Sequence, residues 1–191
     1  MKNNVILIGY MGCGKSTVGK KLAEMCRFSF LDTDEWIEKK EEITISEIFA
    51  AKGEAYFRDL ETECLKELLK ESDHEGSDGT SEFRSEVQGA DENNKKLVIS
   101  VGGGLPVREE NRVLLRQLGT VIYLKAEPDT IYERLKGDTT RPLLQTENPL
   151  QRIKDMMAVR EEKYMTVAHR IILVDGKSIP EIVNEIMNVS N

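Results

Sequence analysis

The sequence predicts one α/β domain, with a central parallel sheet that is flanked by helices. Short apolar runs alternate along the chain with amphipathic stretches, which is typical of this architecture. The first apolar run, at residues 5–8, leads directly into a glycine-rich segment that opens a helical pattern. A strand, a glycine-rich loop and a helix in this order are typical of domains that bind phosphate groups. The 191 residues suffice for a single domain with its own core, so we expect one domain over residues 1–191.

The expected strands are short apolar runs, and several lack the polar alternation of a sheet with one face in water. This pattern is expected where helices cover both faces of the sheet. We expect strands at residues 5–8, 29–31, 97–101, 121–124 and 170–174.

The stretches between these strands carry helical signals. Val18, Leu22 and Cys26 recur every four residues, and this spacing predicts a helix that buries one stripe of side chains. Thr44 and Glu47 have the spacing of a capping box, so we expect a second helix to begin there.

Two polar segments stand apart from the alternating pattern. A helix with an apolar face is expected to run to about residue 70, and residues 72–96 after it are rich in Ser, Gly, Asp, Glu and Asn. We expect this acidic segment to be a mobile surface insertion, because it offers few groups that could be buried. The second segment, at about residues 136–149, has the composition of a lid over an active site.

Charge and composition argue against several classes of protein. The net charge of −7 opposes binding to nucleic-acid phosphates, so we expect no nucleic-acid partner. No apolar stretch reaches the roughly 20 residues that a membrane span needs, so we expect a cytoplasmic protein with no membrane partner. The three cysteines and two histidines lack the spacings of a disulfide framework or a zinc site. Nothing in the sequence requires an oligomer, so we expect a monomer.

Residues 9–17 read Gly-Tyr-Met-Gly-Cys-Gly-Lys-Ser-Thr, which has the pattern G-x-x-x-x-G-K-S of a phosphate-binding loop. Glycines let the backbone turn its N–H groups toward phosphate oxygens, and the helix that follows contributes its positive end. Lys15 would reach the outer phosphates of a nucleoside triphosphate, and the Ser16 hydroxyl would bind Mg²⁺. The alternative is a chance match, but the flanking strand and helix are the context that confirms the pattern. The sequence therefore predicts a phosphate-transferring kinase.

Two carboxylates follow the second expected strand. Asp32 and Asp34 are two residues apart, so on an extended chain they would project on the same side. In a doubly wound sheet, ligands bind at the carboxyl ends of the strands. One carboxylate could orient Mg²⁺ through water, and the other could accept a hydroxyl proton from the acceptor substrate. The alternative is that these residues only start the helix at residues 35–36, because Asp is a common cap.

Motifs spread over the chain resemble, in order and spacing, those of the shikimate kinase family. The resemblance covers nearly the whole chain apart from residues 72–96. The motifs are residues 9–17, 32–34, 53–58 (Gly-Glu-Ala-Tyr-Phe-Arg), 101–104 (Val-Gly-Gly-Gly) and 141–144 (Arg-Pro-Leu-Leu), and Arg160 followed by Tyr164.

The resemblance implies a fold like that of the nucleoside monophosphate kinases, with a lid and a central parallel sheet of strand order 2-3-1-4-5. It also implies that the enzyme transfers the γ-phosphate of ATP to the 3-hydroxyl of shikimate. The products would be shikimate 3-phosphate and ADP, in the biosynthesis of chorismate and the aromatic amino acids.

The resemblance further implies roles for individual residues. ATP would be bound by Gly12, Cys13, Gly14, Lys15, Ser16, Thr17 and the lid residue Arg141. Mg²⁺ would be held near Ser16 and Asp32, and shikimate would be bound by Asp34, Arg58, Gly103 and Arg160. The catalytic residues would be Asp34, as the base, with Lys15 and Arg141. Arg58 and Arg160 would hold the shikimate carboxylate, since arginine pairs with a carboxylate in a two-pronged geometry that lysine cannot reproduce.

The sequence departs from the family pattern at two places. The family usually has proline two residues after the arginine that corresponds to Arg160, and this chain has Glu162 there. The substitution bears on the backbone around Arg160, not on its charge. The insertion at residues 72–96 is the second departure, and we expect it to leave the fold away from the catalytic end.

Two other functions remain open on the sequence alone. A small-molecule kinase that resembles gluconate kinase could use the same arginines, because gluconate also carries a carboxylate. A nucleotide-dependent switch would share the phosphate loop, but a GTP switch usually has an N-K-x-D signature that this sequence lacks.

Overall fold

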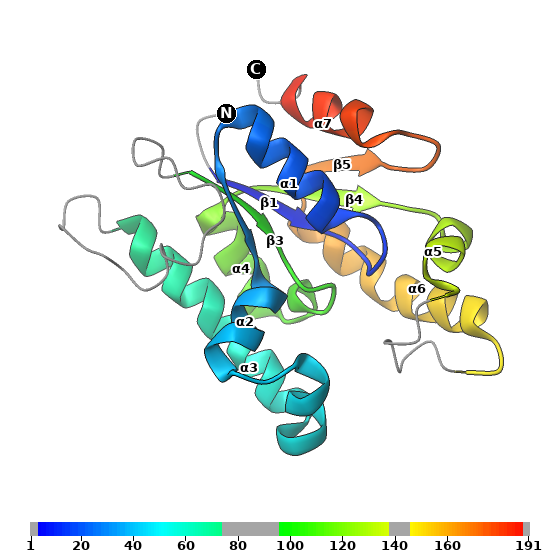
Figure 1. Ribbon diagram of the computed structural model, residues 1–191, viewed down its shortest axis with the longest axis horizontal. Helices are drawn as coiled ribbons and strands as arrows, with labels where there is room; N and C mark the ends of the chain where they lie inside the picture. The colour runs from blue at the N-terminus through cyan, green and yellow to red at the C-terminus, as the bar shows by residue number, and fades with distance from the viewer. Residues whose placement is uncertain (1–3, 74–95, 138–145, 189–191) are drawn as a thin grey trace.

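Five parallel strands form a single sheet at the centre of the fold. The computed structural model describes residues 4–73, 96–137 and 146–188 (Figure 1). The strand order is β2-β3-β1-β4-β5, and each neighbouring pair is parallel. This result confirms the expected fold class, strand order and strand positions. The strands are β1 (Asn4–Ile8), β2 (Ser29–Asp32), β3 (Leu97–Ser100), β4 (Gly119–Lys125) and β5 (Arg170–Leu173).

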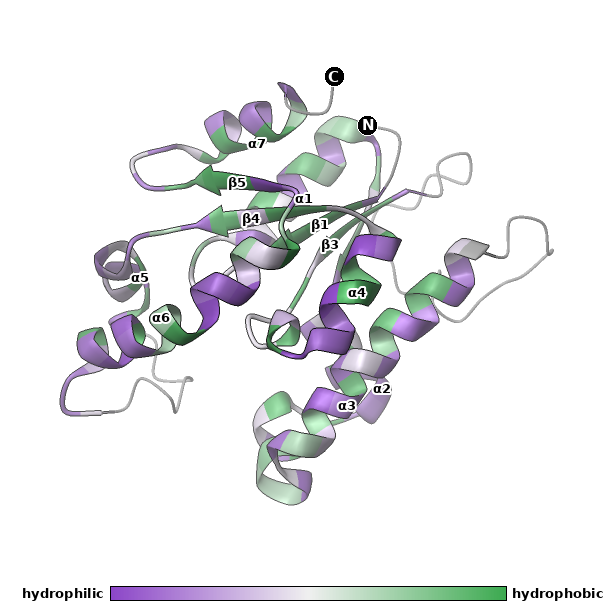
Figure 2. Ribbon diagram, turned by 180° about the vertical axis from the view of Figure 1, so that it is seen from behind, coloured by the Kyte–Doolittle hydropathy of each residue, from purple (hydrophilic) through white to green (hydrophobic). Residues whose placement is uncertain are grey.

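Helices connect the strands and cover both faces of the sheet. They are α1 (Lys15–Cys26), α2 (Thr33–Glu41), α3 (Ile45–Asp73), α4 (Glu109–Leu118), α5 (Pro128–Leu135), α6 (Pro149–Val167) and α7 (Ile179–Asn188), with a short 3₁₀ helix η2 (Leu105–Val107) after β3. Helices α1 and α7 lie on one side of the sheet, and α3, α4 and α6 lie on the other (Figures 1 and 2). Among the described residues, none of these helices is both long and apolar enough to cross a membrane.

The central strand β1 shows why the sheet is buried on both faces. Val5 and Leu7 pack into the apolar cluster that includes α1 and α7, and Ile6 and Ile8 pack into the cluster that includes α3 and α4. All four side chains are fully buried. Successive side chains of a strand point to opposite faces, so a continuous apolar run is what a doubly covered strand requires.

Local sequence signals explain where two of the helices begin. The N–H of Thr44 donates to Glu47 Oε2 at 2.8 Å, and the N–H of Glu47 donates to Thr44 Oγ1 at 3.2 Å. This reciprocal pair confirms the predicted capping box at the start of α3. Helix α1 begins after Gly14, whose φ of 99° is easily reached only without a Cβ. Val18 and Leu22 of α1 are buried as the periodicity predicted.

Helix α3 differs from the expectation in length and continuity. It runs to Asp73 and not to about residue 70, so the first two residues of the predicted loop are helical. The Ser72 hydroxyl donates to the Leu68 carbonyl at 3.1 Å, which satisfies the polar side chain within the helix. The helix is interrupted at Gly53, whose φ of 81° and ψ of 172° are not helical. The remaining part of the predicted insertion and most of the predicted lid lie outside the described residues.

The carboxyl ends of β1, β2 and β3 meet at one edge of the sheet, because the strands are parallel. The phosphate loop follows β1, the helix α2 follows β2, and three glycines at residues 102–104 follow β3. At the opposite edge, the Ser29 N–H donates to the Lys96 carbonyl at 3.0 Å. The chain therefore enters β3 at the edge remote from the phosphate loop.

Candidate active site

A cavity of about 670 Å³ opens at the carboxyl edge of the sheet. It is lined by the phosphate loop, the end of β2, the glycines after β3, and side chains from α3, α5, α6 and the start of α7. Nearly all the predicted site residues line this cavity. They are Gly12, Cys13, Gly14, Lys15, Ser16, Thr17, Asp32, Asp34, Arg58, Gly103 and Arg160. Arg141, the predicted lid residue, lies outside the described residues.

Lys15 is buried at the start of α1, and its ammonium group lies inside the phosphate loop. Its Nζ donates to the carbonyl of Gly9 at 3.0 Å and to the carbonyl of Tyr10 at 3.1 Å. These two carbonyls hold the charge at the wall of the cavity, and no carboxylate of the described residues forms an ion pair with it. An incoming phosphate oxygen would therefore meet a positive charge that is already in place.

Ser16 and Asp32 form the oxygen-rich part of the phosphate end. The Ser16 hydroxyl donates to Asp32 Oδ2 at 2.7 Å and lies 3.4 Å from the hydroxyl of Ser100. The other oxygen of Asp32 accepts the N–H of Asp34 at 3.1 Å and so caps α2. Oxygen donors from a hydroxyl and a carboxylate are the ligands that Mg²⁺ prefers. Asp32 thus serves both as a helix cap and as a member of the site.

The prediction that Asp32 and Asp34 project on the same side of an extended chain is wrong, although both residues line the cavity. The chain is extended at Asp32 but helical from Thr33 onward, so the two carboxylates do not project from one extended segment. Asp34 instead lies in the first turn of α2. The sequence showed the strand end but not that the helix would begin at once.

Two buried carboxylate oxygens converge beside Gly102. Asp34 Oδ1 and Glu61 Oε1 have no hydrogen-bond partner among the described residues. A Cβ added to Gly102 would lie 2.5 Å from Asp34 Oδ1 and 2.9 Å from Glu61 Oε1, so only glycine fits here. Burial, with a smaller contribution from the charge of Asp32, raises the pKa of Asp34 to about 6. Burial also raises the pKa of Glu61 to about 7, although Arg58 opposes this shift.

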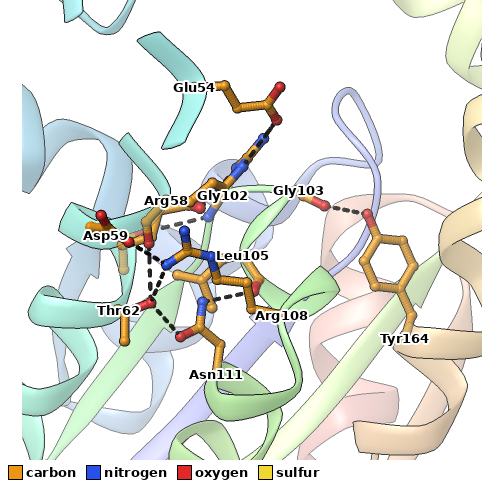
Figure 3. A network of polar contacts seen from close by, with 12 residues as sticks. Glu54, Arg58, Asp59, Thr62, Gly102, Gly103, Leu105, Arg108, Asn111 and Tyr164 are labelled. Carbon is orange, nitrogen blue, oxygen red and sulfur yellow. Dashed lines mark hydrogen bonds and ion pairs between the residues drawn. The ribbon is translucent and has the colours of Figure 1, made fainter. Parts of the chain in front are cut away.

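Arg58 projects from α3 between these carboxylates and the glycine-rich turn. Its Nη1 donates to Glu61 Oε2 at 2.8 Å. Its Nε and Nη2 donate to Glu54 Oε1 at 3.2 and 2.9 Å (Figure 3). A Cβ added to Gly104 would lie 2.2 Å from Arg58 Nη1, so the guanidinium packs directly against the turn. Glu61 was not predicted, although its spacing of three residues from Arg58 on a helix was a usable signal.

Side chains from three elements hold the glycine-rich turn after β3. The N–H of Gly102 donates to Thr33 Oγ1 at 3.1 Å. The hydroxyl of Tyr164 donates to the carbonyl of Gly103 at 2.5 Å (Figure 3). Burial raises the pKa of Tyr164, so its hydroxyl stays protonated and able to donate. The carbonyl of Leu105 accepts from Asn111 Nδ2 at 2.9 Å. The backbone that faces the cavity is therefore fixed before any ligand binds.

Arg160 reaches the cavity from α6, whose helix is continuous past it to Val167. The guanidinium lies over the ring of Tyr10, 5.7 Å from its centroid. Glu162, which replaces the family proline, is part of this helix, and its carbonyl accepts the hydroxyl of Thr166 at 2.8 Å. The departure from the family pattern therefore leaves Arg160 on the cavity wall.

Sequence reasoning missed several cavity residues beyond the phosphate loop. Arg134 at the end of α5 lines the cavity, and its Nη1 donates to the carbonyl of Gly12 at 3.1 Å. Lys177 and Ser178, just before α7, line the same region. No motif marked these positions, since they approach the loop through the sheet order and not through local sequence.

The phosphate loop between β1 and α1, at the carboxyl edge of a parallel sheet of this order, defines a P-loop kinase. The family model described as "Shikimate kinase" matches residues 11–85 and 73–191. The shikimate kinase of Persephonella marina is 42% identical over 184 residues, which cover 96% of each chain. That of Alkaliphilus oremlandii is 40% identical over 189 residues, covering 98% of each chain. The chain belongs to the shikimate kinase family.

Solved structures show the same relationship. The shikimate kinase from Acinetobacter baumannii in complex with shikimate has a TM-score of 0.82 and 35% identity, covering 98% of this chain and 92% of that one. A gluconokinase from Sinorhizobium meliloti has a TM-score of 0.54 at 17% identity, covering 96% and 88%. This second likeness shows a shared fold alone.

Proposed function

We propose that this kinase transfers the γ-phosphate of ATP to the 3-hydroxyl of shikimate. The observation that carries the proposal is the division of one cavity into a phosphate end and an acceptor end. Lys15 and Ser16 line the first, and Asp34, Arg58 and Arg160 line the second. An acceptor with both a hydroxyl and a carboxylate would place the hydroxyl at Asp34 and the carboxylate at the arginines. The family and the shikimate complex of the Acinetobacter relative support this assignment.

The acceptor hydroxyl would attack the γ-phosphorus as its proton passes to Asp34. The new O–P bond forms while the bond between the γ-phosphorus and the bridging oxygen of ADP breaks. With a pKa of about 6, Asp34 is largely ionised near neutral pH yet remains more basic than an exposed carboxylate. Lys15 would stabilise charge on the transferred phosphate, and the N–H groups of the loop would hold the phosphates that remain on ADP.

Ser16 and Asp32 are the residues that would hold Mg²⁺, together with phosphate oxygens and water. Their oxygens lie 2.7 Å apart, and the donor set fits this ion. Among the described residues, no group of three or more His, Cys, Asp or Glu could hold a metal ion alone. A site with few protein ligands is typical of Mg²⁺ that arrives with a nucleotide, where it neutralises developing phosphate charge.

The nucleotide base would lie near Arg134 and Lys177, beyond the phosphate loop. One chain supplies residues to both the phosphate end and the acceptor end of the cavity, and we propose that the enzyme acts as a monomer. We place it in the cytoplasm, where free thiols persist, because Cys13, Cys26 and Cys64 are unpaired. We assign residues 1–191 to a single domain and Arg141 to ATP contact and catalysis, as the family resemblance implies.

The proposal is tested by coupled ADP release from MgATP with shikimate, quinate and gluconate as separate acceptors. We expect shikimate to give a kcat/KM at least tenfold above that with either other acid. A higher value with gluconate, or ADP release that no acceptor stimulates, would contradict the proposal.

A further inference from the structure

Glu54 occupies the Nε–Nη2 edge of Arg58, an edge through which a substrate carboxylate could form a two-pronged pair. We propose that Glu54 is an internal stand-in for the substrate carboxylate, which must displace it to reach Arg58. The inference rests on the proposed function, in which Arg58 binds the carboxylate of shikimate. It assigns to Glu54 a role in setting the affinity for an anionic substrate.

The guanidinium of Arg58 is engaged by carboxylates at two edges. On one edge, Nε and Nη2 both donate to Glu54 Oε1, at 3.2 and 2.9 Å. Elsewhere on the guanidinium, Nη1 donates to Glu61 Oε2 at 2.8 Å. A guanidinium binds a carboxylate strongly through two parallel N–H groups on one edge. A substrate carboxylate that pairs with Arg58 through Nε and Nη2 must therefore replace Glu54, and one that uses Nη1 competes with Glu61.

The exposure of the two partners identifies the one that exchanges. The side chain of Glu61 is 0% exposed, whereas that of Glu54 is 66% exposed. Separating Arg58 from Glu61 would leave a carboxylate buried without its partner, which is strongly unfavourable. Glu54 can instead rotate into water, where its charge is solvated and little free energy is lost. Glu54 is therefore the exchangeable partner.

The backbone holds Glu54 in reach of Arg58 while leaving its side chain in solvent. Gly53 interrupts α3, and Glu54 is the first residue of the helical segment that follows. Glu54 lies four residues, or about one helical turn, before Arg58, and an acidic residue before a basic one is the favourable order. On its other side, the guanidinium packs against Gly104, which limits its own movement. Substrate entry therefore moves the glutamate, and the arginine stays in place.

This arrangement favours acceptors that carry an anion. A neutral polyol cannot form an ion pair with the guanidinium, so it does not compensate for the loss of the Glu54–Arg58 pair, and Glu54 stays in place. A carboxylate replaces the Glu54–Arg58 ion pair with an ion pair of its own. The free energy needed to break the Glu54–Arg58 pair lowers the affinity of the substrate. Removing the Glu54 charge should therefore tighten the binding of shikimate.

The test compares equilibrium titrations of shikimate into the wild-type enzyme, Glu54→Gln and Glu63→Gln. Glutamine keeps the shape of Glu54 but removes its charge. Glu63 lies on the same helix, is exposed and does not line the cavity, so its variant controls for the loss of one negative charge. We expect Glu54→Gln to lower the Kd for shikimate about two- to fivefold, the range of an exposed ion pair. The Kd for ATP should not change, and the gain should shrink at high salt.

An unchanged or higher Kd for shikimate in Glu54→Gln, or an equal fall in Glu63→Gln, would overturn the inference. The variant Arg58→Lys separates this failure from a failure of the proposed function. If Arg58→Lys weakens shikimate binding and Glu54→Gln has no effect, only the inferred displacement of Glu54 is wrong, and the role of Arg58 stands. If Arg58→Lys leaves shikimate binding unchanged, Arg58 does not bind the carboxylate, and the proposed assignment itself fails.

Discussion

Asp34 is a carboxylate whose surroundings favour proton transfer over a structural role. Its Oδ1 is buried with no hydrogen-bond partner in the described part of the chain, and its backbone N–H, not its side chain, completes the cap of α2. Replacing Asp34 with Asn keeps the shape and removes the proton acceptor. We expect kcat to fall about 10²- to 10⁴-fold, with ATP affinity and thermal stability close to the wild type. Steady-state kinetics and an ATP titration check this, and near-normal kcat would remove Asp34 from the mechanism.

The raised pKa of Asp34 predicts the acid limb of the pH profile. The carboxylate must be ionised to accept the hydroxyl proton, and its pKa lies at about 6, above the ordinary value near 4. The kcat/KM for shikimate should therefore be level above about pH 7 and fall as the pH decreases through 6. Initial rates from pH 5 to 8 at saturating MgATP measure this limb. A profile that stays level down to pH 5 would show that the enzyme–MgATP complex keeps Asp34 ionised.

Substitution of Arg58 or Arg160 should affect the affinity for shikimate but not the affinity for ATP. Replacing either with Lys keeps the charge but loses the two-pronged geometry. We expect shikimate affinity to fall roughly 10- to 150-fold, the equivalent of about 1.5–3 kcal/mol, with little change for ATP. Separate titrations of the two substrates measure the effect. An equal loss of ATP affinity would place these arginines at the phosphate end.

At the scale of elements, a buried polar contact joins α3 to α4 and to the turn after β3. The Thr62 hydroxyl donates to Asn111 Oδ1 at 2.8 Å, and Asn111 Nδ2 donates to the Leu105 carbonyl at 2.9 Å (Figure 3). Asn111 is fully buried, so its amide has no alternative partner in water. Because Thr62 lies one turn after Arg58, the contact also sets the distance between Arg58 and the glycine-rich turn.

Asn111→Leu should destabilise the fold by about 1–3 kcal/mol, because the buried Leu105 carbonyl loses the Asn111 donor and the Thr62 hydroxyl keeps only the Arg58 carbonyl as acceptor. Shikimate affinity should fall as well, since α3 is no longer fixed to the turn. Urea unfolding and shikimate titration measure the two effects. The double variant with Thr62→Val should cost less than the sum of the single variants. Additive costs would show that the two side chains do not act together.

The sequence predicted elements where local patterns decide the structure. Apolar runs located all the strands, and the spacing of Thr44 and Glu47 located the start of α3. Sequence reasoning failed where contacts between distant segments decide. Asn111 looks like an ordinary helix residue until α3 packs beside it, and Arg134 meets Gly12 only because α5 ends beside the phosphate loop. The resemblance supplied Arg58 and Arg160, which composition alone does not separate from surface charges.

At the scale of the whole molecule, the proposed ligand cavity and the start of β3 lie at opposite edges of the sheet. The cavity lies at the carboxyl ends of β2 and β3, whereas Lys96 and Leu97, which follow the insertion, lie at the amino end of β3. Replacing residues 74–95 with a short Gly-Ser linker should leave kcat and both KM values within about twofold. Kinetics of the shortened enzyme check this. A tenfold loss of shikimate affinity would show that the segment contributes to the site.

The central claim is that the two ends of one cavity bring a phosphate and an acceptor hydroxyl together. Phosphorus NMR of the reaction of MgATP with shikimate tests it most directly. We expect one new phosphate monoester, attached at the 3-hydroxyl, in an amount equal to the ADP formed. Inorganic phosphate in place of the ester, or an ester at another hydroxyl, would contradict the positions assigned to Asp34, Arg58 and Arg160.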